Sequence, residues 1–237
     1  MQLFYHPDID QQTGLVFFSR EESRHIVRVL RKKAGDRLFL TDGKGFLYEA
    51  EIIDPSDKRC QARIRNKESK PDSKGYRLHV AMAPTKMNDR FEWFLEKSTE
   101  IGIDEITPVL CDQSERKKVN HERYAKVIQA AAKQSLRCTL PKLNPLQKFD
   151  DLIGTSNAEA KLIAYCSPGD KGRLGNLVDG KTDILVLIGP EGDFSSREIE
   201  LAKESQFKGL ELGSSRLRTE TAGVVVCSNL AMIKEIL

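Results

Sequence analysis

The sequence lacks the segments that mark a membrane or exported protein. Its longest strongly apolar run, residues 184–188, has the length of a strand, whereas a membrane-spanning helix needs about 18 apolar residues. The first residues show no basic stretch followed by an apolar one, so no signal peptide is predicted. We therefore expect a cytoplasmic protein with no membrane partner.

The sequence also lacks paired cysteines. Its five cysteines are an odd number, lie far apart and form no C-x-x-C pair, which excludes the spacing of a zinc site or a redox dithiol. No metal site is predicted. We expect reduced thiols, most of them in the core.

Net charge is small, but it is unevenly distributed. The whole chain carries 38 Lys and Arg against 35 Asp and Glu; residues 1–70 hold 14 of the basic and 11 of the acidic ones. Residues 123–149 contain six basic side chains and no acidic one. Two basic patches suit a polyanion held at two places, although such runs are more often ordinary solvated faces. Charge alone favours the second interpretation.

A polar segment with Pro and Gly, residues 66–76, is the best candidate for a linker. It divides the chain into predicted domains at residues 1–70 and 71–237. Strands are expected at 37–40, 46–53 and 60–64, and a helix at 21–30 with Ser19 as its N-cap. Short strands over about 70 residues indicate a compact β-barrel, a shape common among RNA-binding domains.

The second part alternates strands with helices. The expected strands are 78–83, 106–110, 161–166, 183–188 and 209–212, and the expected helices are 88–101, 122–136, 195–206 and 219 to the C-terminus. Gly102 stands where a helix C-terminal glycine belongs, and Ser195 with Glu198 forms a capping box. Alternation of this kind predicts an α/β fold with a mainly parallel sheet covered on both faces. In helix 122–136, the periodicity directs a basic stripe outward.

Two glycine-containing segments each follow an expected strand and precede a helix. In parallel sheets, ligands bind at such loops, and glycine lets a backbone approach closely. Residues 188–194 match neither the dinucleotide fingerprint nor the phosphate loop, and an ordinary strand-to-helix turn explains them equally well. Residues 212–222 place Arg218 and Glu220 at a helix N-terminus. They have the parts to hold a planar heterocycle and its proton; alternatively, Glu220 only complements the helix dipole and Arg218 pairs with Glu220.

Taken together, the motifs resemble one family. They are His25 to Arg31 with Gly35-Asp36, Lys86 with Trp93, 96–102, Ile106 with Pro108, Gln134-Ser135 with Arg137 and Pro141, 189–192 and 217–222. In this order they are similar to the SPOUT-type methyltransferases that methylate N3 of a uridine in 16S ribosomal RNA (the RsmE family), over essentially the whole chain. The resemblance implies a PUA-like N-terminal barrel and a C-terminal SPOUT domain with a trefoil knot. It also implies a homodimer packed through the knotted domains, acting on the small ribosomal subunit.

The resemblance further implies an S-adenosyl-L-methionine site made by three loops. The residues it assigns to this cofactor are Tyr165, Ile188, Gly189, Pro190, Glu191, Gly192, Leu212, Gly213, Leu217, Thr221 and Ala222. The residues it assigns to RNA are His25, Arg28, Arg31, Arg90, Lys97, Gln134 and Arg137. On spacing alone, Lys97 and Glu100 form an ordinary surface ion pair equally well.

The chemistry of uracil suggests the catalytic residues. Because N3 carries an imide proton, the site must favour the anion that forms when this proton leaves, and Arg218 and Glu220 are expected to do so. The sequence departs from the family pattern at two places: Asp193 replaces a second glycine, and Ser215-Arg216 replaces Arg-Ile. The alternatives are a methyltransferase for another base or a ribose 2′-hydroxyl, a catalytically silent RNA-binding assembly protein and a generic nucleotide-binding domain.

Overall fold

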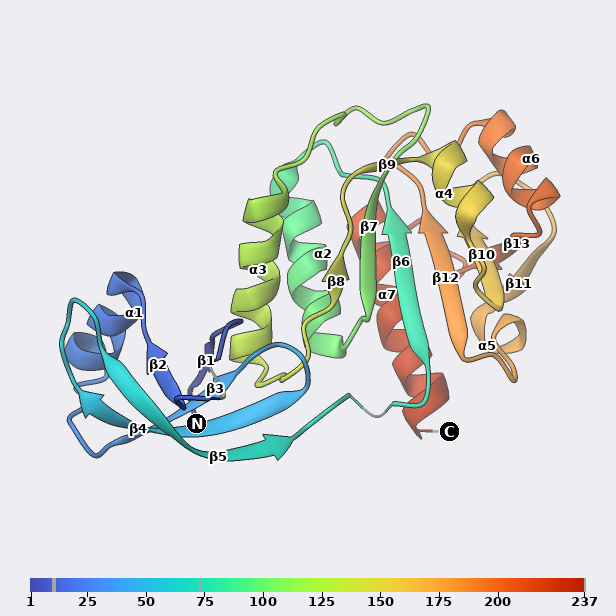
Figure 1. Ribbon diagram of the computed structural model, residues 1–237. Helices are drawn as coiled ribbons and strands as arrows, with labels where there is room; N and C mark the ends of the chain where they lie inside the picture. Colours follow the sequence, from blue (N-terminus) through green and yellow to red (C-terminus); the bar gives the residue numbers. More distant parts are fainter. Residues whose placement is uncertain (10–11, 73, 237) are drawn as a thin grey trace. The chain divides into compact units, whose positions relative to one another are not determined.

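The computed structural model describes residues 1–9, 12–72 and 74–236 and divides the chain into two compact units (Figure 1). The first comprises Met1–Asp72 together with Ala132–Leu140, and the second comprises Ser73–Ala131 and Pro141–Leu237. The segment Ala132–Leu140 therefore belongs to the first unit, although it begins with the last residues of α3 (His121–Gln134), whose other residues belong to the second unit. In the described part of the chain, no helix is long and apolar enough to cross a membrane.

The first unit is built around a five-stranded sheet in the order β1-β3-β4-β5-β2. Its elements are β1 (Leu3–Tyr5), β2 (Leu15–Phe17), α1 (Arg20–Arg24), a π-helical turn (His25–Val29), β3 (Arg37–Thr41), β4 (Phe46–Asp54) and β5 (Gln61–Ser69). β1 and β3 are parallel and the other pairs are antiparallel. Alternate residues of β3 and β4 pack with Phe4, Phe18 and Ile26 in one core. The Ser19 side chain caps α1 by accepting from the Glu22 amide, as predicted.

The second unit contains a parallel sheet in the order β11-β13-β10-β12-β6-β7-β8, and β9 also pairs with β7. Its strands are β6 (Arg77–Met82), β7 (Glu105–Leu110), β8 (Lys142–Leu143), β9 (Gln147–Lys148), β10 (Ala160–Ala164), β11 (Lys171–Arg173), β12 (Asp183–Ile188) and β13 (Lys208–Glu211). Its helices are α2 (Asn88–Ile101), α3 (His121–Gln134), α4 (Phe149–Thr155), α5 (Leu174–Leu177), α6 (Ser196–Glu204) and α7 (Thr219–Ala231), followed by a π-helical turn (Met232–Ile236). The predicted α/β class is confirmed.

Helices cover both faces of this sheet (Figure 1). On one face, α4 and α6 pack on a cluster that includes Ala81, Leu185 and Ile163. On the other, α7 lies against β6, and its Gly223 is so close to α2 that an added Cβ would stand 2.6 Å from the Phe94 ring. Purely parallel strands need both faces covered because their side chains are apolar on both sides.

Several local predictions are confirmed. Gly102 ends α2 in the left-handed conformation, with φ of 110°. Ser195 and Glu198 form the capping box of α6. Four of the five cysteines are buried, and burial raises the pKa of Cys227 to about 12 and of Cys60 to about 11, which keeps both thiols protonated. Cys166 is exposed.

The close packing of α2 and α7 gives a test of the fold. Gly223→Ala is expected to destabilise the protein by about 1–3 kcal/mol, because the new methyl group must displace the Phe94 ring. Gly154→Ala in α4 is the matched control: its Cβ would meet nothing within 4 Å, so a gain of about 0.4–1 kcal/mol is expected. Urea unfolding followed by circular dichroism measures both; equal midpoints for the two variants would contradict this packing.

Candidate active site

Three loops meet at the carboxyl edge of the parallel sheet. They follow β10, β12 and β13, and they are neighbours because β10 pairs with both β12 and β13. The loops enclose a cavity of about 750 Å³, whose walls also include Arg90 of α2 and the first turn of α7. This is the edge at which parallel sheets bind ligands.

The cavity contains most of the residues predicted to bind a cofactor. Nine of the eleven form its walls: Tyr165, Ile188, Gly189, Pro190, Glu191, Leu212, Gly213, Leu217 and Ala222. Gly192 and Thr221 are not among its wall residues. Gly192 instead lies against Gln113, and a Cβ added at this position would stand too close to Gln113 Oε1, so the flexible glutamine side chain would have to move.

Sequence reasoning missed other wall residues, among them Cys166, Lys171 and Asp193. Position beyond a strand could have indicated Cys166, which follows β10. Lys171 had no such signal, because it lies in a short strand that the sequence pattern does not reveal. Its Nζ donates to the carbonyls of Tyr165, at 3.0 Å, and Ser167, at 2.9 Å, and so holds the loop after β10 in a closed turn.

Asp193, which replaces a glycine of the family pattern, has φ of 70°. The turn therefore requires a left-handed residue, and aspartate tolerates this conformation better than most residues. Its Oδ2 accepts from the Cys166 amide at 2.8 Å, and its Oδ1 accepts from the Phe194 amide at 2.9 Å. The carboxylate thus joins the loop after β12 to the loop after β10, a link that glycine cannot make.

Further hydrogen bonds fix the loop after β12. Thr219 Oγ1 donates to the Gly189 carbonyl at 3.1 Å, which connects this loop to the start of α7. The Glu191 carboxylate accepts from the Lys86 amide at 2.9 Å, which connects it to the chain after β6. The walls are therefore held in place before any ligand arrives, which lowers the cost of binding.

The predicted catalytic residues differ in their position. Arg218 lies on the cavity wall at the N-cap of α7, where its side chain makes no capping bond, and it has no ion-pair partner among the described residues. Glu220 is buried behind the wall, with Oε1 3.9 Å from Nε of Arg90. Its Oε2 is buried and has no hydrogen-bond partner in the described part of the chain. Arg90, predicted to bind RNA, is part of the cavity wall.

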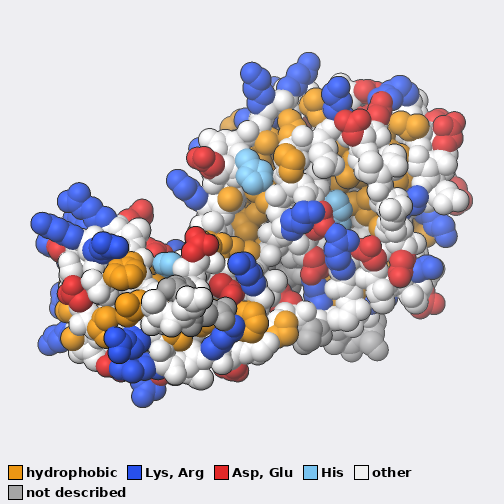
Figure 2. All heavy atoms as spheres, in the orientation of Figure 1, with side chains coloured by type: hydrophobic (Ala, Val, Ile, Leu, Met, Phe, Trp, Pro, Cys, Tyr) orange, Lys and Arg blue, Asp and Glu red, His pale blue; other side chains and the backbone are white. Residues whose placement is uncertain are grey.

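The other residues predicted to bind RNA are divided between the units. His25, Arg28, Arg31, Gln134 and Arg137 belong to the first unit, where Lys and Arg side chains spread around α1 (Figure 2). Arg28 Nε donates to Asp57 at 2.8 Å, and Arg137 pairs with Asp72 at 2.9 Å.

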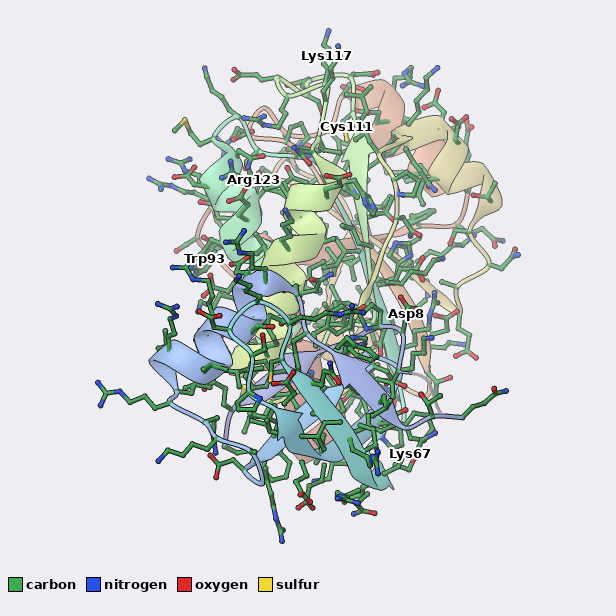
Figure 3. The ribbon with its side chains drawn as sticks, turned by 60° about the vertical axis from the view of Figure 1, so that its left-hand side comes forward. Asp8, Lys67, Trp93, Cys111, Lys117 and Arg123 are labelled. Atoms are coloured by element: carbon green, nitrogen blue, oxygen red, sulfur yellow. The ribbon has the colours of Figure 1, made fainter. Side chains whose placement is uncertain are left out.

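Lys97 of the second unit forms ion pairs with Glu96 and Glu100, as its spacing allowed. Arg123 belongs to α3, the helix predicted to direct a basic stripe outward, and its Nη2 donates to Oε2 of Glu92 on α2 at 2.9 Å. Figure 3 labels Arg123 beside α2 and α3. Several cations of both units are thus already paired with carboxylates.

Comparison with known proteins shows to which class of protein this chain belongs. Residues 72–231 match a family described as RNA methyltransferase domain, and residues 18–65 match one described as RNA methyltransferase PUA domain. The first match covers more than half of the chain, which therefore belongs to the RNA methyltransferase family, with a PUA-like N-terminal domain as predicted.

The similarity to related proteins extends over nearly the whole length of the chain. The chain is 26% identical over 231 residues to ribosomal RNA small subunit methyltransferase E of Bacillus subtilis, covering 92% of this chain and 90% of that protein. A probable rRNA-methyltransferase from Porphyromonas gingivalis is similar in structure, with 39% identity, a TM-score of 0.90 and coverage of 100% and 99%. Ribosomal RNA small subunit methyltransferase E from Neisseria gonorrhoeae, bound to S-adenosyl methionine, has 26% identity, a TM-score of 0.88 and coverage of 98% of both chains.

The bridging carboxylate of Asp193 can be tested by substitution. Asp193→Ala should lower stability by about 1–3 kcal/mol, because it removes two hydrogen bonds and keeps a side chain at positive φ. Asp193→Gly, the control, relieves the backbone strain but loses the same bonds. Hydrogen exchange at the Cys166 amide should therefore accelerate in both variants, whereas the free energy of unfolding should fall further in Asp193→Ala than in Asp193→Gly. Unchanged exchange at Cys166 would show that the link is not formed in solution.

Proposed function

We propose that this protein transfers a methyl group from S-adenosyl-L-methionine to N3 of a uridine in 16S ribosomal RNA. The observation that carries the proposal is the cavity, which brings the motifs of two separate loops together with Arg90 and Arg218. Family membership supports an RNA substrate, and the relatives named for the small ribosomal subunit support its 16S RNA. N3 as the methylated atom comes from the resemblance of the motifs.

The cavity fits the cofactor. Its volume of about 750 Å³ lies within the range of small-molecule sites, roughly 300–1,000 Å³. Ile188, Leu210, Leu212 and Leu217 offer apolar wall to a purine ring, and Glu191 and Glu211 add carboxylates. When bound, the cofactor supplies a sulfonium-activated methyl group. The neighbour bound to S-adenosyl methionine supports the same use of the site here.

The chain's own residues must handle the uracil imide. N3 becomes a good nucleophile only after its proton leaves, and the resulting charge spreads over O2 and O4. We assign Arg218 to hydrogen-bond one of these oxygens and stabilise the charge, since Arg218 lines the cavity and has no ion-pair partner among the described residues. Glu220 is buried and does not line the cavity, so we assign it an orienting role rather than that of the proton acceptor. The remaining parts of the proposal, a trefoil knot and a homodimer through the second unit, rest on the resemblance.

The reaction is tested with labelled S-adenosyl-L-methionine and small ribosomal subunits, or their naked RNA, from a strain lacking the gene. N3-methyluridine is the expected product, and Arg218→Ala should lose at least about 100-fold in rate while cofactor affinity stays within a few fold. Arg173→Ala, on β11 outside the cavity, is the matched control and should methylate normally. A 2′-O-methyl product, or none, would refute the proposed function. Normal turnover in Arg218→Ala would refute only its role.

Phosphate contacts by the first unit predict a measurable salt effect. Arg31→Gln should weaken RNA binding and make the slope of log affinity against log salt shallower by about one, because one phosphate contact is lost. Arg28→Gln and Arg137→Gln should act in the same direction. Arg65→Gln, on β5 of the same unit and assigned no RNA contact, is the control. A slope in Arg31→Gln equal to that of the wild-type protein argues against a phosphate role.

A further inference from the structure

The position of Arg90 is set by the contact between α2 and α7. Arg90 is the third residue of α2, and Glu220 is the second residue of α7. Because Gly223 has no side chain, the Phe94 ring fits against α7, and the two helices pack closely. This packing brings the first turn of α2 next to the first turn of α7, where Arg90 Nε lies 3.9 Å from Glu220 Oε1.

Glu220 is a buried carboxylate that needs compensation. Its side chain is 8% exposed, and its Oε2 has no hydrogen-bond partner among the described residues. The N-terminus of α7 favours a negative charge but leaves this oxygen unsatisfied. Burying such a group is costly unless a cation or donor lies near it. Arg90 is the cation that the structure places there, with 37% of its side chain exposed.

The two groups have different access to the cavity. Arg90 forms part of its wall together with Arg218, whereas Glu220 does not. A ligand in the cavity can therefore contact Arg90, whereas Glu220 does not line the cavity and can act on the ligand only through another residue. Because the 3.9 Å ion pair with Glu220 is longer than a hydrogen bond, it occupies none of the N–H donors that the planar Arg90 guanidinium offers to a ligand.

We propose that Arg90 is a second guanidinium that binds the target base and that Glu220 is the residue that positions it. Resting on the proposed function, this assigns Arg90 and Arg218 to the two carbonyl oxygens of uracil. The N3–H bond breaks, the proton passes to water, and its electron pair stays on the base as an anion shared by N3, O2 and O4. Two donors that face O2 and O4 stabilise this anion more than the neutral base.

The decisive variants are Arg90→Met, Glu220→Gln and their combination, measured in single-turnover methylation of the small ribosomal subunit. Arg90→Met is expected to lose at least about 100-fold at neutral pH, with cofactor affinity within about threefold. The loss should shrink as the pH rises, because the imide then ionises without help. Glu220→Gln alone should lower the methylation rate, but in the Arg90→Met background it should cause little further loss, since Glu220 acts through Arg90. Arg173→Met is the matched control.

The outcomes separate this proposal from the function on which it rests. If the wild-type protein makes no N3-methyluridine, the proposed function fails. If it does and Arg90→Met keeps a rate within about threefold at neutral pH, the role of Arg90 fails. If Glu220→Gln lowers the methylation rate by the same factor in the wild-type protein and in Arg90→Met, Glu220 acts directly and its positioning role is overturned. Should Arg90→Met fail to fold, Arg90→Lys decides: a roughly tenfold loss supports the proposal, and the wild-type rate overturns it.

Discussion

The parallel pairing of β10 with β12 and β13 decides where the functional loops of the second unit lie. Strands that run in one direction end at one edge, so loops that are far apart in sequence become neighbours there. Antiparallel pairing would send the loop after β12 to the opposite edge and divide the cavity. The register depends in turn on apolar residues on both strand faces, which α4 and α6 cover on one side and α7 on the other.

The helices of the second unit do more than shield the sheet. Gly223 permits the close approach of α2 and α7, and this approach sets one arginine of the cavity against a buried carboxylate. Asp193 fixes two loops relative to each other, because its carboxylate accepts a hydrogen bond from a backbone amide of the neighbouring loop while its own backbone is left-handed. Both devices hold polar groups in place before substrate binds, which is how electrostatic stabilisation becomes effective without reorganisation during the reaction.

Much of this architecture could be predicted from periodicity and caps. Residues 88–101 and Gly102 were predicted as a helix and its end, and the strand at 183–188 and the capping box at Ser195 were found in the same way. Short strands such as β1 and β11 were missed because three residues give no period. That Ala132–Leu140 belongs to the first unit could also not be predicted from the sequence, since it depends on tertiary contacts. In the site, loops could be predicted from their position after strands, whereas the pairing of Arg90 with Glu220 requires the angle and spacing of two helices.

The central claim is that the cavity at the carboxyl edge is where cofactor and uridine meet. It is tested most directly by a crystal structure of the protein with S-adenosylhomocysteine and a uridine-containing oligonucleotide of the target sequence. The account predicts the nucleoside of the cofactor product against Ile188, Leu210 and Leu212, and the uracil between the guanidiniums of Arg90 and Arg218. Cofactor density outside the three loops, or a uracil that contacts neither guanidinium, would contradict it.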